Sequence, residues 1–134
     1  MFELHPRLAA DCHIVGDLPL SRLLLSNDRR WPWLILVPRR ADIRDLDELT
    51  SEDRGRLMNE AMAATAAIRA LHDPHKMNVA ALGNMVPQLH LHVIGRFRED
   101  PAWPGPVWGV GTAEPYPPAE AEAAVAAFRE RLLG

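Results

Sequence analysis

The residues most suited to chemistry lie at alternate positions of one short segment, Gln88-Leu89-His90-Leu91-His92-Val93-Ile94. In an extended strand, residues two positions apart share a face, so Gln88, His90 and His92 are expected to project together. The apolar residues between them would then enter the core: Leu89, Leu91 and Val93. The pattern predicts two imidazoles and one amide on the polar face of a half-buried strand.

Two neighbouring imidazoles allow three interpretations, which their spacing leaves open. They are half-exposed histidines with local hydrogen bonds, or they chelate zinc, iron or manganese, as His-x-His on a strand often does. A metal would need a third ligand, and no further carboxylate, cysteine or histidine stands at a recognised spacing. In the third interpretation a neutral imidazole, with an ordinary pKa of about 6.5, attacks phosphorus without needing a base.

The same segment resembles the histidine-triad (HIT) signature, His-φ-His-φ-His-φ-φ, of nucleotidyl hydrolases and transferases, with Gln88 in place of the first His. The likeness extends over roughly residues 20 to 108. Ser26-Asn27-Asp28 and the apolar run that ends at Pro38 are similar to the nucleotide-binding strand pair of the family. Trp33 stands where some members carry a His that partners the first triad His. Losing both histidines suggests one coordinated change.

The resemblance implies a role for each matching position. His90 aligns with the nucleophile, whose other ring nitrogen is held by a main-chain carbonyl. His92 would contact the phosphate and the leaving group, donating a proton when charged, and Gln88 would hydrogen-bond the same cluster. Asn27 is expected to contact ribose or phosphate. Asn84, in a turn beside the triad segment, is either a donor to a phosphate oxygen or a simple turn residue.

The function implied is that of an enzyme that cleaves at the α-phosphate of a nucleoside phosphoramidate or dinucleoside polyphosphate. The reaction would pass through a covalent nucleotidyl-His90 intermediate and need no protein-bound metal, although Mg²⁺ is compatible with a polyphosphate substrate. One alternative is a nucleotide-binding sensor without turnover. Another is a metal-dependent, cupin-like enzyme built on His-x-His. The resemblance further implies a homodimer formed through a long helix and a sheet edge.

Composition limits the partners and the compartment. The chain of 134 residues suits one HIT-like domain over residues 1–134. A formal charge of −3 gives no overall attraction for a nucleic-acid polymer, although a local basic patch is conceivable at Arg29, Arg30, Arg39 and Arg40. One cysteine suits a reducing compartment. With no secretory signal and no apolar run of roughly 20 residues, we expect a cytoplasmic protein without membrane contacts.

The remaining pattern predicts the elements that position these residues. Short apolar runs bounded by turn residues indicate strands over 12–15, 21–26, 33–37 and 76–82, and from the triad segment to Phe97. Thr50 is expected to cap a long helix in which Met58 and Met62 broaden a buried stripe, and Pro117-Pro118 to begin a C-terminal helix. Because strands and helices do not alternate regularly, we expect an α+β fold with an antiparallel sheet of about five strands.

Overall fold

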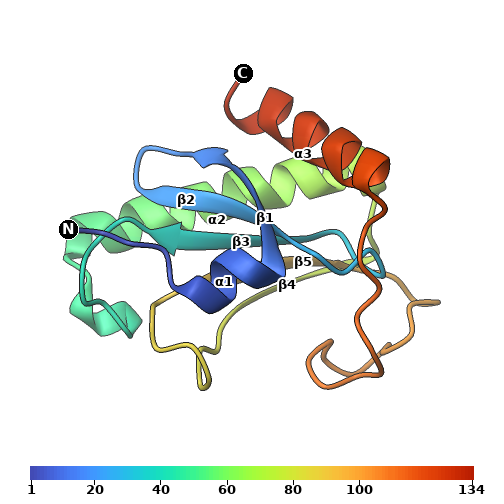
Figure 1. Ribbon diagram of the computed structural model, residues 1–134, viewed down its shortest axis with the longest axis horizontal. Helices are drawn as coiled ribbons and strands as arrows, with labels where there is room; N and C mark the ends of the chain where they lie inside the picture. Colours follow the sequence, from blue (N-terminus) through green and yellow to red (C-terminus); the bar gives the residue numbers. More distant parts are fainter.

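The computed structural model describes residues 1–134 and is built around one antiparallel sheet with strand order β1-β2-β3-β5-β4 (Figure 1). The strands are β1 (Cys12–Asp17), β2 (Ser21–Ser26), β3 (Trp33–Pro38), β4 (Lys76–Ala81) and β5 (Leu91–Arg96). The helices are α1 (Pro6–Asp11), α2 (Ser51–His72) and α3 (Pro118–Leu132), with a 3₁₀ turn η1 (Leu46–Glu48). This confirms the α+β class, the five-stranded antiparallel sheet, the long helix and the C-terminal helix.

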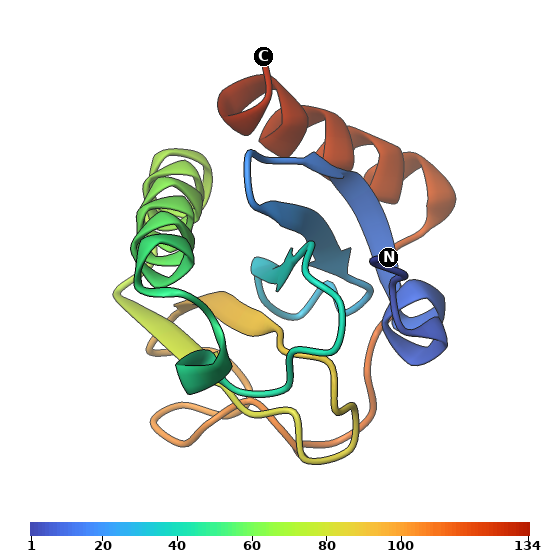
Figure 2. The ribbon, with the colours of Figure 1, turned by 90° about the vertical axis from the view of Figure 1, so that its left-hand side faces the viewer.

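The sheet separates two apolar clusters because successive side chains of a strand point to opposite faces. On one face, residues of β3 and β5 such as Leu34, Leu36 and Val93 pack beneath the helices. On the other face, Trp33, Ile35 and Ile94 belong to a second cluster that also includes residues of α1 and of the 97–117 connection. Figure 2 shows α2 and α3 on one side of the curved sheet and this connection passing the other side.

Helix α2 begins and ends where local signals predict. The Thr50 hydroxyl accepts a hydrogen bond from the Asp53 N–H at 3.1 Å, and Asp73 ends the helix in the left-handed conformation (φ 48°). Four residues of the expected stripe are buried, Leu57, Ala61, Ala64 and Ile68, whereas Leu71, which was expected to continue it, is 36% exposed. Met58 and Met62, however, are 55% and 47% exposed, so the prediction that they fill the core is wrong. The sheet covers a narrower arc of α2 than the apolar residues span.

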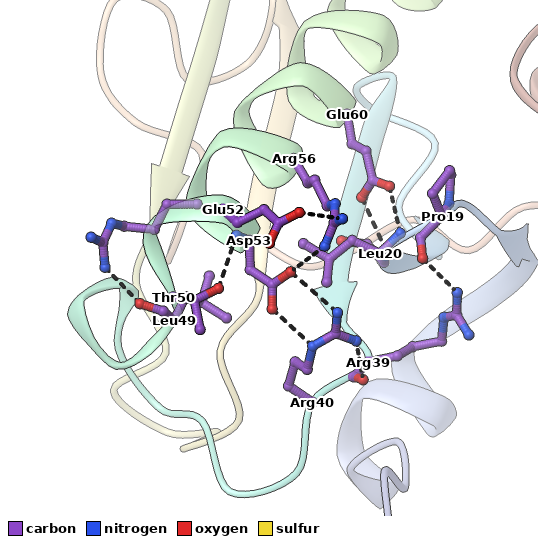
Figure 3. Close-up of polar contacts among 12 residues, drawn as sticks. Pro19, Leu20, Arg39, Arg40, Leu49, Thr50, Glu52, Asp53, Arg56 and Glu60 are labelled. Atoms are coloured by element: carbon purple, nitrogen blue, oxygen red, sulfur yellow. Dashed lines mark hydrogen bonds and ion pairs between the residues drawn. The ribbon is translucent and has the colours of Figure 1, made fainter.

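Two carboxylates of α2 fasten the helix to the sheet (Figure 3). The Glu60 carboxylate accepts hydrogen bonds from the backbone N–H groups of Leu20 at 2.8 Å and Ser21 at 3.1 Å, at the start of β2. Asp53 accepts two from the Arg40 guanidinium, which follows β3. Since buried N–H groups are costly to leave unpaired, these bonds hold α2 in a fixed position relative to the β1–β2 hairpin.

The suggested basic patch is absent because its members have local partners. Arg29 pairs with Glu114 and Glu120, and Arg30 with Asp28. The Arg39 guanidinium donates to the carbonyl of Leu18 at 2.7 Å. With Arg40 bound to Asp53, all four arginines serve the fold. No helix is both long and apolar enough to cross a bilayer, and the cytoplasmic location stays a prediction.

Candidate functional site

The two imidazoles lie together at the start of the strand next to the β4 edge. His92 lies in β5, where its Cα is paired with Ile35 of β3 and Ala80 of β4. His90 stands just before the strand, which begins at Leu91. Each histidine is only 6% exposed, and their ring centroids are 4.9 Å apart. The predicted meeting of two imidazoles on one face is therefore present.

A main-chain carbonyl orients His90. The distance from His90 Nδ1 to the Gln88 carbonyl oxygen is 2.7 Å. Because a carbonyl oxygen only accepts, Nδ1 carries the proton and donates, and Nε2 of the neutral ring keeps its lone pair. This is the arrangement that the family resemblance implied. In the turn before the triad segment Gly83 has a φ of +66°, a conformation that glycine adopts without strain.

A buried indole orients His92, whose Nδ1 accepts a hydrogen bond where that of His90 donates one. Trp33 Nε1 donates to His92 Nδ1 at 3.0 Å, and the rings of His92 and Trp108 form a T-shaped pair with centroids 5.1 Å apart. Burial lowers the pKa of His92 to about 3, with the neighbouring His90 as the second cause. His92 is thus neutral at physiological pH, and Trp33 contacts the third triad position instead of the first.

Gln88 does not project with the histidines, contrary to the expectation from alternate spacing. Its side-chain oxygen accepts from the His5 backbone N–H at 2.8 Å, and its side-chain nitrogen donates to the Glu3 carbonyl at 2.8 Å. Since β5 begins three residues later, strand alternation does not extend to position 88. The Gln88 amide therefore ties down the N-terminal segment, while its backbone carbonyl holds His90.

A cavity of about 340 Å³ opens beside the two histidines. Its lining is mostly apolar and comes from the turn after β4, the two histidines and the 97–117 connection: Leu82, Gly83, Asn84, Met85, Val86, His90, His92, Trp108 and Gly109. Of the two expected substrate contacts, Asn84 lines this cavity. Asn27 does not, because its amide oxygen accepts hydrogen bonds from His13 Nε2 and the Tyr116 N–H, both at 3.0 Å.

Sequence reasoning missed Trp108 as a residue of this site. The only signal was the Trp-Gly pair inside the segment 101–118, which is rich in Pro, Gly and Trp and was predicted to be irregular. The sequence left open whether this segment folds over the active face or over a partner subunit, and the structure brings Trp108 against His92. Elsewhere, no three His, Cys, Asp or Glu side chains lie close enough together to hold a metal ion, so the cupin-like interpretation lacks its ligands.

Comparison with known proteins agrees with this geometry. The HIT domain family model matches residues 7–99. A histidine triad protein from Marinobacter aquaeolei is 50% identical, with a TM-score of 0.96 over 99% of this chain and 97% of that one. Another, from Sinorhizobium meliloti, is 48% identical, with a TM-score of 0.95 over 98% of both chains. A third, from Bradyrhizobium japonicum, is 41% identical, with a TM-score of 0.94 over 98% of both.

None of the curated proteins matches the chain. The family model, however, covers more than half of its length, and the solved relatives cover nearly all of it. The chain belongs to the histidine triad family.

Proposed function

We propose that this protein is a nucleotidyl hydrolase or transferase, one HIT-like domain over residues 1–134, in which His90 attacks the α-phosphorus of a bound nucleotide. Membership of the family supports a nucleotide-binding hydrolase or transferase. The observation that carries the proposal is the hydrogen bond from His90 Nδ1 to the Gln88 carbonyl at 2.7 Å, which leaves Nε2 as the free nucleophile. The substrates proposed are nucleoside phosphoramidates and dinucleoside polyphosphates.

The remaining residues support binding of the phosphate. Asn84 lines the cavity, where its amide N–H would donate to a phosphate oxygen, and the apolar lining suits a base or sugar. His92, neutral and bound to Trp33, has its Nε2–H free to donate to a second oxygen. If Asn27 contacts ribose, it does so through its amide nitrogen, because its oxygen is already occupied twice.

The direct test is to trap the nucleotidyl-enzyme intermediate. The protein is mixed with each substrate class, quenched within milliseconds under alkaline denaturing conditions that spare N–P bonds, and weighed intact. We expect a nucleotidyl adduct that maps to His90 and is absent from His90→Asn. His75→Asn, which removes an exposed imidazole outside the cavity, is the matched control. Equal turnover by His90→Asn would exclude the nucleophile. Tight binding of a nucleoside monophosphate without any turnover would favour the sensor instead.

We also propose that two copies pair through β4 and α2. β4 is an edge strand of the sheet, and α2 lies near this edge (Figure 2). Apolar side chains there face outward, with Met58 55%, Met62 47% and Val79 38% exposed. An open strand edge beside exposed apolar residues favours pairing with the same strand of a second copy. Sedimentation equilibrium should give twice the chain mass, and Met62→Glu should lower it; a monomeric wild type would refute the pairing.

A further inference from the structure

The hydrogen bond between Trp33 and His92 fixes which nitrogen of His92 carries its proton. The indole N–H can only donate, so His92 Nδ1 must accept and the single proton of the neutral ring lies on Nε2. The sheet register explains the contact. Trp33 is paired with Ile94 and His92 with Ile35, which makes Trp33 and His92 diagonal neighbours on one face of adjacent strands.

The surroundings of His92 disfavour its protonated, positively charged form. Trp33 is 9% exposed and His92 6%, so little water reaches their hydrogen bond. A charged imidazolium would carry a proton on both nitrogens and would lose the indole as a partner. The other rings against His92 are Trp108, which is uncharged, and His90. Burial and His90 together hold the pKa of His92 well below its ordinary value.

No other group in the cavity wall is a proton donor of useful acidity. Apart from the two histidines, the wall consists of apolar residues, glycines and Asn84. His90 is committed as the nucleophile, and the Gln88 amide is bound to the N-terminal segment. Asp45 lines an adjacent cavity that includes His90 but not His92. The cavity wall thus offers neutral hydrogen-bond donors, among them His92 Nε2–H and the Asn84 amide, and no acid.

We propose that Trp33 is a positioning residue that holds His92 as a neutral hydrogen-bond donor, so that the enzyme favours substrates whose leaving group departs as a stable anion. This inference rests on the proposed function. In the first step the His90 Nε2 lone pair forms the N–P bond, and the bond from phosphorus to the leaving oxygen breaks. Its electron pair stays on that oxygen, which leaves as a phosphate anion without a proton.

The second step returns the enzyme to its starting state. A water oxygen bonds to phosphorus, the N–P bond breaks, and its electron pair returns to His90 Nε2. One proton of the water passes to solvent, and the other stays on the new phosphate oxygen until that oxygen ionises. His92 Nε2–H donates to a non-bridging oxygen throughout. An amine leaving group, by contrast, must take up a proton as the P–N bond breaks, and the cavity has no residue to supply it. Phosphoanhydrides are therefore the favoured class over phosphoramidates.

The first experiment reads the tautomer directly and needs no substrate. Nitrogen-15 NMR of protein with labelled histidine should show His92 with a bare Nδ1 and a protonated Nε2. Trp33→Phe should lose this preference. Trp31→Phe is the matched control, because Trp31 is also buried, has its ring centroid 6.3 Å from that of Trp33 and has no partner for its own indole N–H. A protonated Nδ1 in the wild type would overturn the proposal.

The second experiment reads the leaving group. Single-turnover rates are measured for nucleoside 5′-phosphate aryl esters whose phenols differ in pKa. We expect wild-type rates to fall steeply as the phenol becomes less acidic, and Trp33→Phe to be slower by about tenfold throughout, the effect of losing about one hydrogen bond. Trp33→His, which can relay a proton, should flatten the dependence. Wild-type rates that do not vary with the phenol would overturn the inference. If no ester is turned over, the proposed function fails, and the NMR result still decides the role of Trp33.

Discussion

The state of His92 predicts how the stability of the protein changes with pH. In the folded protein burial lowers the pKa of His92 to about 3, whereas an unfolded chain binds the same proton near 6.5. Between these values the unfolded state holds more protons, so the free energy of unfolding decreases as the pH falls below 6.5. The full difference of about 3.5 pH units corresponds to ~5 kcal/mol, and about 2 kcal/mol of it is lost between pH 7 and pH 5.

The measurement is urea unfolding at pH 7, 6 and 5, in the wild type and in His92→Gln, which offers an acceptor to the Trp33 indole. We expect the wild type to lose about 2 kcal/mol more than the variant over this range. His75→Gln, which removes an exposed imidazole, should follow the wild type. The range stops at pH 5 because hydrogen bonds from Arg30 and Arg40 help to lower the pKa of Asp28 and Asp53, whose contributions are lost in stronger acid. If His92→Gln shows the same pH dependence as the wild type, His92 titrates normally and the reasoning is refuted.

Two further predictions concern polar groups that hold the site in place. Gln88→His should expose the backbone of Glu3 to His5 to hydrogen exchange and lower activity, because imidazole nitrogens point apart and cannot pair with both backbone groups; a sharp rise in activity would contradict this and the idea of one coordinated change. Arg96→Ala should destabilise the fold by about 3–5 kcal/mol in thermal unfolding, because it leaves the carboxylate of Asp100, whose side chain is 3% exposed, without its ion pair. Exposed Arg98→Ala is the control, and an equal effect there would refute the assignment.

Local signals were sufficient to predict most of the sheet and the long helix. β2 has the predicted bounds, and the start of α2 follows from the hydroxyl of Thr50 and the acidic residues after it. Helix α1 and the turn η1 were not predicted. They contain six and three residues, too few for a periodic pattern, and such short helices depend on packing against the rest of the fold.

The candidate site was predicted in its residues but not in its contacts. The spacing of His90 and His92 was enough to bring the two rings together, because one strand and the residue before it carry both. The hydrogen-bond partner of His92 could not be predicted, because it depends on the register between two strands. Trp33 meets His92 only because β3 and β5 pair with Trp33 opposite Ile94. The direction of Gln88 depends on an N-terminal segment more than eighty residues away.

The same contacts bear on the idea that Gln88 and Trp33 changed together. The Gln88 side chain binds Glu3 and His5, whereas Trp33 binds His92, so the two share no hydrogen-bond partner. Side chains without shared partners usually have additive effects. In a double-mutant cycle of Gln88→Ala and Trp33→Phe, we expect the free energies of unfolding to add within about 0.5 kcal/mol.

A larger coupling energy would contradict this independence. The coupling would then pass through the N-terminal segment, which contacts both residues. Phe2 and Leu4, on either side of Glu3, pack against the apolar cluster that includes Trp33. Releasing the N-terminal segment would then loosen the indole. Adding Leu4→Ala to the cycle separates the two cases, because it removes the apolar contact and leaves the backbone bonds to Gln88 in place. If Leu4→Ala abolishes the coupling, the two positions act as one unit through the N-terminal segment, and the substitution of one is constrained by the other.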